Sequence, residues 1–367
     1  MAADTELSLG TGVLASQHLA ELIDKGMIRG TPSLEPAQIQ PASIDLRLGT
    51  VAHRIRASFL PGKERKVAKR LSDFSMHSID LSNGAVLERG CVYLVPLMES
   101  LDLPSSLSAV ANAKSSTGRL DLFTRLITDQ GTEFDRIDAG YSGPLYAEIS
   151  PRSFSVLARP GARLNQIRFR HGQALLSDED LRERHAAQKL VDGPAHIDGG
   201  LGFSVDLDRG PEAIVGYRAK PHTGLIDLDR LNHYPVAQFW EEVRAPEKRI
   251  ILDPGAFYIL VSREAVHIPP DCAAEMAPYV AMVGEFRVHY AGFFDPGFGH
   301  VAAGGAGARG VLEVRCHEAP FALEHGQIVG RLVYEQMAER PAQLYGADLG
   351  SNYQGQSLKL SKHFCAD

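Results

Sequence analysis

The sequence is poor in the residues that build covalent cross-links and metal clusters. Its 367 residues include four cysteines, Cys91, Cys272, Cys316 and Cys365, which lie far apart and form no CxxC pair. This spacing excludes a disulfide framework and a zinc knuckle, and it suits a reducing compartment. No run reaches the roughly 18 apolar residues of a membrane span, and residues 1–17 lack a signal-peptide pattern. We therefore expect a soluble, cytoplasmic protein that has no membrane partner.

Positive charge is also in short supply. The chain carries 38 lysines and arginines against 45 acidic residues, for a net charge of -7. This balance disfavours a nucleic-acid partner, although a few residues suffice for a local phosphate pocket. The sequence has no GxxxxGK[ST] loop, no HExxH pair and no HxE…PCxxC set of zinc deaminases. We therefore expect no zinc.

Short apolar runs bounded by glycine and proline dominate what is present. They predict many short strands, most clearly at 91–97, 107–113, 143–149, 163–172 and 328–336. Helical patterns cover residues 14–27, with Ser16 as the candidate N-cap, and residues 178–190. Together these signals favour a mainly β barrel or sandwich with a few short helices.

Four segments recur in the same order along the chain. The segments at 40–49, 87–107, 138–149 and 157–169 are echoed at 200–210, 252–272, 295–314 and 323–334. Shared turn and strand texture explains a single echo, but order and spacing are kept together, so we infer an internal duplication. The copies are placed at residues 1–175 and 176–367.

The stretch KSSTGR at 114–119 combines hydroxyl groups with a guanidinium. Ser115, Ser116 and Arg119 have the short donors and the bidentate fork that suit a polyphosphate. The alternative is a strand that ends in a serine turn with a solvated arginine.

Two glutamates, Glu148 and Glu313, end alternating strands in equivalent positions of the two copies. A carboxylate that faces inward is costly unless it is paired or functional, and burial prepares it for general-base chemistry. The alternative is a cross-strand ion pair with an arginine such as Arg152 or Arg315.

The polar tail at 344–364 contains aromatic residues and a flexible YQGQ core. It has the composition of a lid in which Tyr353 stacks on a ligand and Gln356 donates a hydrogen bond. The alternative is a frayed terminus.

The ordered set QPASIDLRLG, AKSSTGRLDL, IDAGYSGPLYAEI, RPGARLNQIRF and YQGQ resembles the dCTP deaminase family of the dUTPase-like superfamily. The resemblance spans nearly the whole chain as two tandem copies. It implies two dUTPase-like distorted β-barrel or jelly-roll domains in a homo-oligomer, usually a trimer, with sites between subunits or copies. It also implies deamination of dCTP to dUTP and ammonia, with Mg²⁺ on the triphosphate and no zinc.

Carried over by motif, the resemblance assigns roles to residues of both copies. Glu148 would be the general base, with Ser115 and Arg119 assisting it, and Glu313 would be its counterpart. The implied substrate-binding residues are Lys114, Ser115, Ser116 and Arg119 for the phosphates, Asp138 for the deoxyribose, and Ala291, Asp295, Tyr345, Tyr353 and Gln356 in the second copy and its tail.

Each copy departs from the family pattern in its own way. The second copy has PYVAMV at 278–283 where the serines and the arginine belong, and the first copy has a lengthened segment from Arg119 to Asp138. One hypothesis places the site in the first copy with Glu148 as the base, which the intact clamp favours. The other is a composite site that uses Glu313 and the backbone around Ala291. Alternative functions are a dUTPase, a bifunctional enzyme that forms dUMP, and a non-catalytic nucleotide-binding protein.

Overall fold

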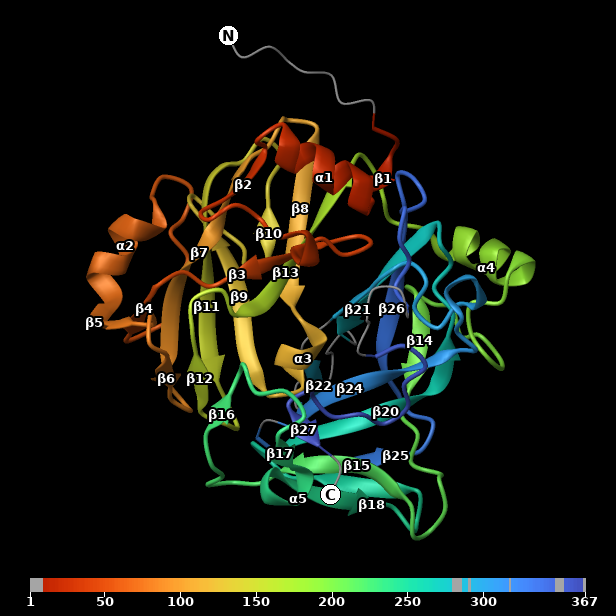
Figure 1. Cartoon of the computed structure of the whole chain (residues 1–367). Coiled ribbons are helices and arrows are strands. Elements are labelled where there is room, and N and C mark those ends of the chain that lie inside the picture. Colours follow the sequence, from red (N-terminus) through yellow and green to blue (C-terminus); the bar gives the residue numbers. More distant parts are fainter. Residues whose placement is uncertain (1–8, 279–285, 290–291, 317, 347–352, 366–367) are drawn as a thin grey trace. The chain divides into compact units, whose positions relative to one another are not determined.

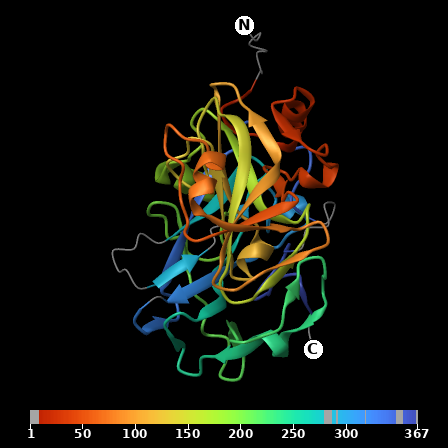
Figure 2. The same cartoon turned by 90° about the vertical axis from the view of Figure 1, so that its left-hand side faces the viewer.

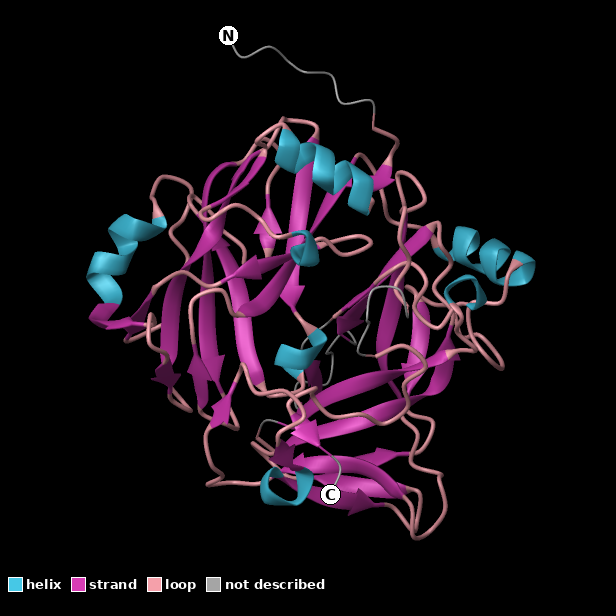
Figure 3. Cartoon of the chain, in the orientation of Figure 1, coloured by secondary structure: helices cyan, strands magenta, loops and turns pink. Residues whose placement is uncertain are grey.

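Strands make up most of this chain and its helices are short, as the sequence predicts (Figure 3). This computed structural model describes residues 9–278, 286–289, 292–316, 318–346 and 353–365. Contacts between residues divide the chain into two compact units. The first unit comprises Met1–Lys114, Phe123–Leu175 and Glu335–Gln343, and the second comprises Ser115–Leu122, Leu176–Tyr334 and Leu344–Asp367.

Two main sheets build the first unit (Figure 1). One has the order β1-β13-β8-β10 with β3 beside β13, and the other has the order β5-β4-β7-β11-β9 with β2 beside β7. Strands β6 and β12 form a further antiparallel pair. The bounds are β1 Gly12–Val13, β2 Ile28–Gly30, β3 Ile44–Arg47, β4 Val51–Ile55, β5 Ser75–Asp80, β6 Ala85–Leu87, β7 Val92–Asp102, β8 Leu107–Ala113, β9 Leu122–Thr128, β10 Arg136–Ile137, β11 Ser142–Pro151, β12 Val156–Ala158 and β13 Arg163–His171.

Two amphipathic helices pack against these sheets. Helix α1 (Ser16–Asp24) buries Leu19 and Leu22 in a cluster that includes Leu107 of β8. Its N-cap is Ala15, so the expectation of a Ser16 cap is wrong, because Ser16 is already the first helical residue. Helix α2 (Val67–Phe74) packs beside β4 (Figure 2) and was not predicted from the sequence.

The second unit has two main sheets of its own, in the orders β14-β26-β21-β23 and β18-β15-β20-β24-β22. Helix α4 (Asp178–Ala187) begins with a capping box, in which Ser177 and Asp180 bond to each other's backbone N–H. The bounds of this unit's other strands and of helix α5 are β14 Leu201–Ser204, β15 Ile214–Ala219, β16 Ile226–Asp227, β17 Tyr234–Pro235, α5 Val236–Phe239, β18 Trp240–Arg244, β19 Arg249–Leu252, β20 Phe257–Val266, β21 Cys272–Pro278, β22 Phe286–His289, β23 Phe293–Phe294, β24 Ala308–Cys316, β25 Phe321–Glu324, β26 Ile328–Gln336 and β27 Phe364–Cys365.

The two glutamates occupy matching places in matching strand pairs. Glu148 of β11 lies opposite Leu94 of β7, and Glu313 of β24 lies opposite Ile259 of β20. Leu94 and Ile259 are themselves aligned in the sequence echo of 87–107 with 252–272. The observed registers therefore agree with the alignment of the repeats.

The tyrosines next in each register repeat the same detail. Tyr93 pairs with the residue after Glu148, and Tyr258 pairs with the residue after Glu313. The Tyr93 hydroxyl accepts from the backbone N–H of Glu88, and the Tyr258 hydroxyl accepts from that of Asp253, both at 3.0 Å. A shared side-chain contact at equivalent turns supports the duplication inferred from the sequence.

Candidate active site

The segment between β8 and β9 carries the two serines. Ser115–Gly118 form a single helical turn, α3. Residues 115–122 belong to the second unit by their contacts, although the segments on both sides belong to the first. The sequence repeats assign this segment to the first copy, so its place in the second unit is a finding of the structure. We call Ser115–Leu122 the clamp turn.

Arg119 is the most engaged residue of the clamp turn, and it is only 3% exposed. Its Nη2 donates to Gln356 Oε1 at 2.9 Å and its Nη1 donates to the Lys359 carbonyl at 3.1 Å. The guanidinium stacks on the ring of Tyr353, 3.9 Å from the ring centre. Tail and clamp turn are thus joined through one side chain in the second unit.

Glu313 faces the clamp turn from β24. Its Oε1 lies 3.8 Å from Nε of Arg119, within ion-pair range but beyond a hydrogen bond. Two residues along the same strand, Arg315 forms an ion pair with Asp121 of the clamp turn. Residues at i and i+2 point to one face of a strand. The acidic and the basic residue on this face of β24 therefore each lie near a residue of opposite charge in the clamp turn.

Burial raises the pKa of the Glu313 carboxyl from 4.5 to about 8, and the nearby Arg119 limits the rise. The cause is desolvation, which penalises the charged form of a buried carboxyl. A carboxyl with such a pKa is a strong proton acceptor once it is ionised, and it titrates near the pH at which an enzyme works. Glu313 therefore has the properties of a general acid and base.

The described part of the tail is packed against the clamp turn. The Ser361 hydroxyl lies 2.8 Å from the Ser116 carbonyl and 2.9 Å from Nδ1 of His363. Strand β27 at Phe364–Cys365 pairs in parallel with β17. These contacts argue against a frayed terminus for residues 353–365.

Tyr345 and Asp295 lie near the same group of residues. Burial raises the pKa of the Tyr345 hydroxyl, the charge of Asp295 and the neighbouring Tyr353 raise it further, and Arg119 acts in the opposite direction. Asp295 itself is buried. Nearby, a Cβ placed on Gly292 would lie 3.4 Å from the Ser115 hydroxyl. The backbone just after the predicted position Ala291, which is outside the described residues, therefore approaches the clamp turn.

Glu148 has a different neighbour in the first unit. Arg125 donates to Glu148 Oε1 from Nη2 at 2.5 Å and from Nε at 3.2 Å. This is the ion pair that the sequence offered as an alternative, but with Arg125 in place of Arg152 or Arg315. Within the described residues, the only acidic side chain paired with Arg119 is Glu313. These positions favour Glu313 over Glu148 as the base.

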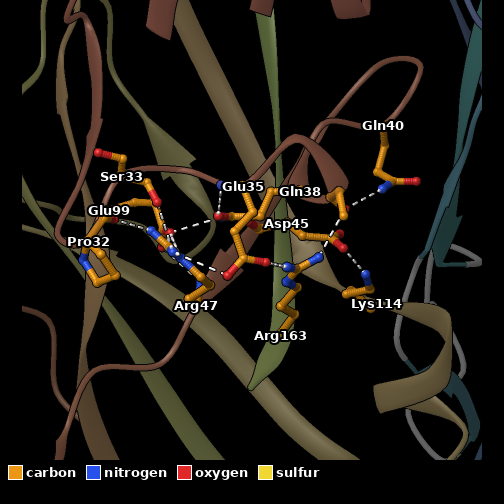
Figure 4. Close-up of polar contacts among 11 residues, drawn as sticks. Pro32, Ser33, Glu35, Gln38, Gln40, Asp45, Arg47, Glu99, Lys114 and Arg163 are labelled. Carbon is orange, nitrogen blue, oxygen red and sulfur yellow. Dashed lines mark hydrogen bonds and ion pairs between the residues drawn. The ribbon is translucent and has the colours of Figure 1, made fainter. Parts of the chain in front are cut away.

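The two remaining predicted residues lie in the first unit. Asp138 is exposed and pairs with Arg136, from Nε to Oδ1 at 3.2 Å. Lys114 is the last residue of the first segment of the first unit, and it forms an ion pair with the buried Asp45 (Figure 4). The same view shows Arg47 enclosed by backbone carbonyls and by Glu99, whose Oε1 accepts from Arg47 Nε at 2.7 Å. Through its ion pair with Lys114, Asp45 fixes the residue that directly precedes the clamp turn.

Three residues of this arrangement, Asp121, Ser361 and His363, were not anticipated, and in the ion-pair alternative Arg315 was expected to pair with Glu313 rather than with Asp121. A signal for the pair of Asp121 and Arg315 exists, because RLD at 119–121 and EVR at 313–315 carry opposite charges in the same i, i+2 spacing. No comparable pattern marks the other two.

The described residues contain no helix long and apolar enough to cross a membrane. In the same part of the chain, no group of three or more His, Cys, Asp and Glu side chains is placed to hold a metal ion.

Comparisons with known proteins place this geometry in context. Residues 10–173 match the family model for the N-terminal domain of 2'-deoxycytidine 5'-triphosphate deaminase, and residues 177–364 match the model for its C-terminal domain. A solved structure, 2'-deoxycytidine 5'-triphosphate deaminase from Agrobacterium tumefaciens, is 56% identical and superposes with a TM-score of 0.86, covering 89% of this chain and 99% of that one.

Curated relatives match about half of this chain but most of their own length. A dCTP deaminase of Natronomonas pharaonis is 31% identical over 50% of this chain and 91% of its own. A protein named "dCTP deaminase, dUMP-forming" from Sulfurihydrogenibium sp. is 28% identical over 43% of this chain and 82% of its own. The second name specifies dUMP as the product, and the first name specifies no product.

Proposed function

Because the chain belongs to the dCTP deaminase family, we propose that it hydrolyses dCTP to dUTP and ammonia at a site built in the second unit. The observation that carries this proposal is the meeting of Arg119, Glu313 and Tyr353, with Glu313 Oε1 3.8 Å from Arg119 Nε and Tyr353 stacked on the guanidinium. The site is composite in sequence, since the clamp turn precedes β9 and the base comes from β24.

Glu313 acts as the general base in this proposal. Its carboxylate takes a proton from water, and the hydroxide adds to C4 of the cytosine ring. The carboxyl then passes this proton to the amino group, the C4–N bond breaks and ammonia leaves. The proton of the new C4 hydroxyl group moves to ring N3, which gives the C4=O and N3–H groups of uracil. The pKa of about 8 lets the carboxyl hold the proton between these steps.

In this proposal Arg119 stabilises the negative charge of the Glu313 carboxylate and keeps the carboxylate in position. Two of its N–H groups are already bonded to Gln356 and to the Lys359 carbonyl, so the guanidinium is fixed before the substrate arrives. Ser115 and Ser116, with the positive charge of Arg119, contact the phosphates, which bring their own Mg²⁺. Preformed donors of this kind stabilise developing charge without reorganisation.

Zinc takes no part in this proposal, because the sequence lacks the HxE…PCxxC ligand set that zinc deaminases use. Glu148 is the duplicate of the base in the first copy, and it is engaged by Arg125. We therefore assign one reactive glutamate to each chain.

The products of dCTP incubated with Mg²⁺ test the proposal. Chromatographic separation should give dUTP, and a coupled assay should give one ammonia for each dUTP. Formation of dUMP and pyrophosphate would instead support the bifunctional reaction. The name of the Sulfurihydrogenibium relative, "dCTP deaminase, dUMP-forming", gives dUMP as its product. Binding of dCTP without either product would overturn catalysis.

A further inference from the structure

In the ion pair of Glu148 and Arg125, the guanidinium lies against the carboxylate as a bound ligand would. Glu148 is 2% exposed and offers one carboxylate oxygen to two N–H groups of the same guanidinium. The second contact of Arg125 is Ser58, whose Oγ accepts from Nη2 at 2.9 Å. Two acceptors within the first unit, Glu148 Oε1 and Ser58 Oγ, thus bond to the edge of the guanidinium.

Aromatic rings contact the faces of the same guanidinium. Its central carbon lies 3.5 Å from the ring centre of Phe134 and 4.8 Å from that of Phe123. A planar group held by aromatic rings on its face and by a carboxylate on its edge is the arrangement that recognises a flat, hydrogen-bonding base or cation. An ordinary cross-strand ion pair needs no such ring contacts.

Phe134 lies in the loop that joins β9 to β10, a few residues beyond the strand that carries Arg125. Glu148 itself sits in the strand register that Glu313 has in the second unit. The loop between β9 and β10 therefore places an aromatic ring on the guanidinium that pairs with the carboxylate corresponding to the proposed base.

We propose that the first unit retains a pocket for a planar cationic or aminopyrimidine edge, and that Arg125 is its built-in ligand. Removal of this side chain opens a binding site at Glu148 for small guanidinium compounds and for cytosine. The choice of cytosine rests on the proposed function, whereas the guanidinium site rests only on the contacts of Arg125.

Chemical rescue of Arg125→Gly tests this pocket with methylguanidinium as the probe. Thermal unfolding of the full chain should show a Tm below that of the wild type. Methylguanidinium at about five times its Kd should raise this Tm by roughly 2–4 °C, because a ligand that binds only the folded state stabilises it. Cytosine should raise the Tm in the same way and uracil should not, since uracil lacks the amino donor.

Arg136→Gly is the matched control, because Arg136 is an exposed arginine that pairs with Glu133 and Asp138 at the surface of the same unit. Equal shifts in this variant, in the wild type and in Arg125→Gly would overturn the pocket. A shift with methylguanidinium but not with cytosine would overturn the nucleobase assignment. If Arg125→Gly does not fold, Arg125→Gln gives the same comparison with a smaller opening.

Arg125→Lys separates planar recognition from charge alone. It keeps the positive charge but loses the flat fork, so its Tm should fall and methylguanidinium should not raise it. A wild-type Tm in this variant would overturn the proposal. Turnover of dCTP should stay within a few-fold of wild type in all of these variants, so failure of the pocket remains distinguishable from failure of the proposed function.

Discussion

Glu148 and Glu313 occupy matching places in matching strand pairs of the two units, yet their surroundings differ. Arg125 approaches Glu148 to 2.5 Å and bonds to it twice, whereas Arg119 stays 3.8 Å from Glu313. The difference comes from other partners, because Arg119 is held back by Gln356, the Lys359 carbonyl and the ring of Tyr353.

This contrast shows that two carboxylates at matching positions can have different chemical properties. A guanidinium in direct contact stabilises the carboxylate and occupies the space in front of it. A guanidinium held at a distance leaves the carboxyl desolvated, with its pKa raised to about 8. In the proposed mechanism, the reactivity of the glutamate therefore depends on the contacts that restrain the arginine as well as on the carboxylate itself.

The largest expected effect is on turnover. Glu313→Gln removes the proton acceptor while keeping its shape, so the rate should fall by about 10²–10⁴. Glu148→Gln should stay within a few-fold of wild type, because Glu148 is engaged by Arg125. Single-turnover rates at saturating dCTP measure both. Collapse in Glu148→Gln alone would place the base in the first unit.

The same two variants should change stability in opposite directions at pH 9. A raised pKa in the folded state means that ionising Glu313 costs stability, beginning above pH 4.5 and complete above about pH 8. Glu313→Gln should therefore gain up to about 4–5 kcal/mol at pH 9 and nothing below pH 4.5. Urea unfolding at both pH values measures this.

Glu148→Gln should lose roughly 1.5–3 kcal/mol at pH 9, because Arg125 would lose a charged hydrogen-bond partner. A gain of stability in this variant would remove the contrast between the two sites.

Arg119→Ala should act on binding and on pH dependence together. Loss of its charged hydrogen bonds should weaken triphosphate binding by about 1.5–3 kcal/mol, measured calorimetrically. Because Arg119 limits the pKa of Glu313, the acid limb of kcat/KM near pH 8 should move to higher pH. Arg125→Ala is the control and should leave both quantities unchanged. If the acid limb of kcat/KM in Arg119→Ala stays at the wild-type pH, Arg119 does not influence the pKa of the base.

Local patterns predicted the strands, helices α1 and α4 and the matching places of the glutamates, because these follow from periodicity and from the repeats. The barrel or jelly-roll closure stays a prediction. The partner of each glutamate did not follow, since Arg119 and Glu313 are 194 positions apart and their meeting depends on the path of the clamp turn. Arg315 also looked like a partner for Glu313, but it pairs with Asp121.

The smallest expected effect compares two buried serines, one in each unit. The Ser361 hydroxyl lies 2.8 Å from the Ser116 carbonyl and 2.9 Å from His363 Nδ1, so it fixes the clamp turn. Ser150 follows Glu148 by two residues, where the second copy has Arg315, and its buried Oγ has no hydrogen-bond partner among the described residues. One hydroxyl is thus used by the structure and the other is not.

Ser361→Ala should cost about 0.5–1.5 kcal/mol of stability and raise the KM for dCTP, because the clamp turn loses its tie to the tail. Ser150→Ala should leave stability unchanged or slightly higher, since it removes an unsatisfied buried group. Urea unfolding and steady-state kinetics of the two variants measure both effects. A KM for dCTP in Ser361→Ala equal to that of Ser150→Ala would mean that Ser361 supports the fold without positioning the clamp turn.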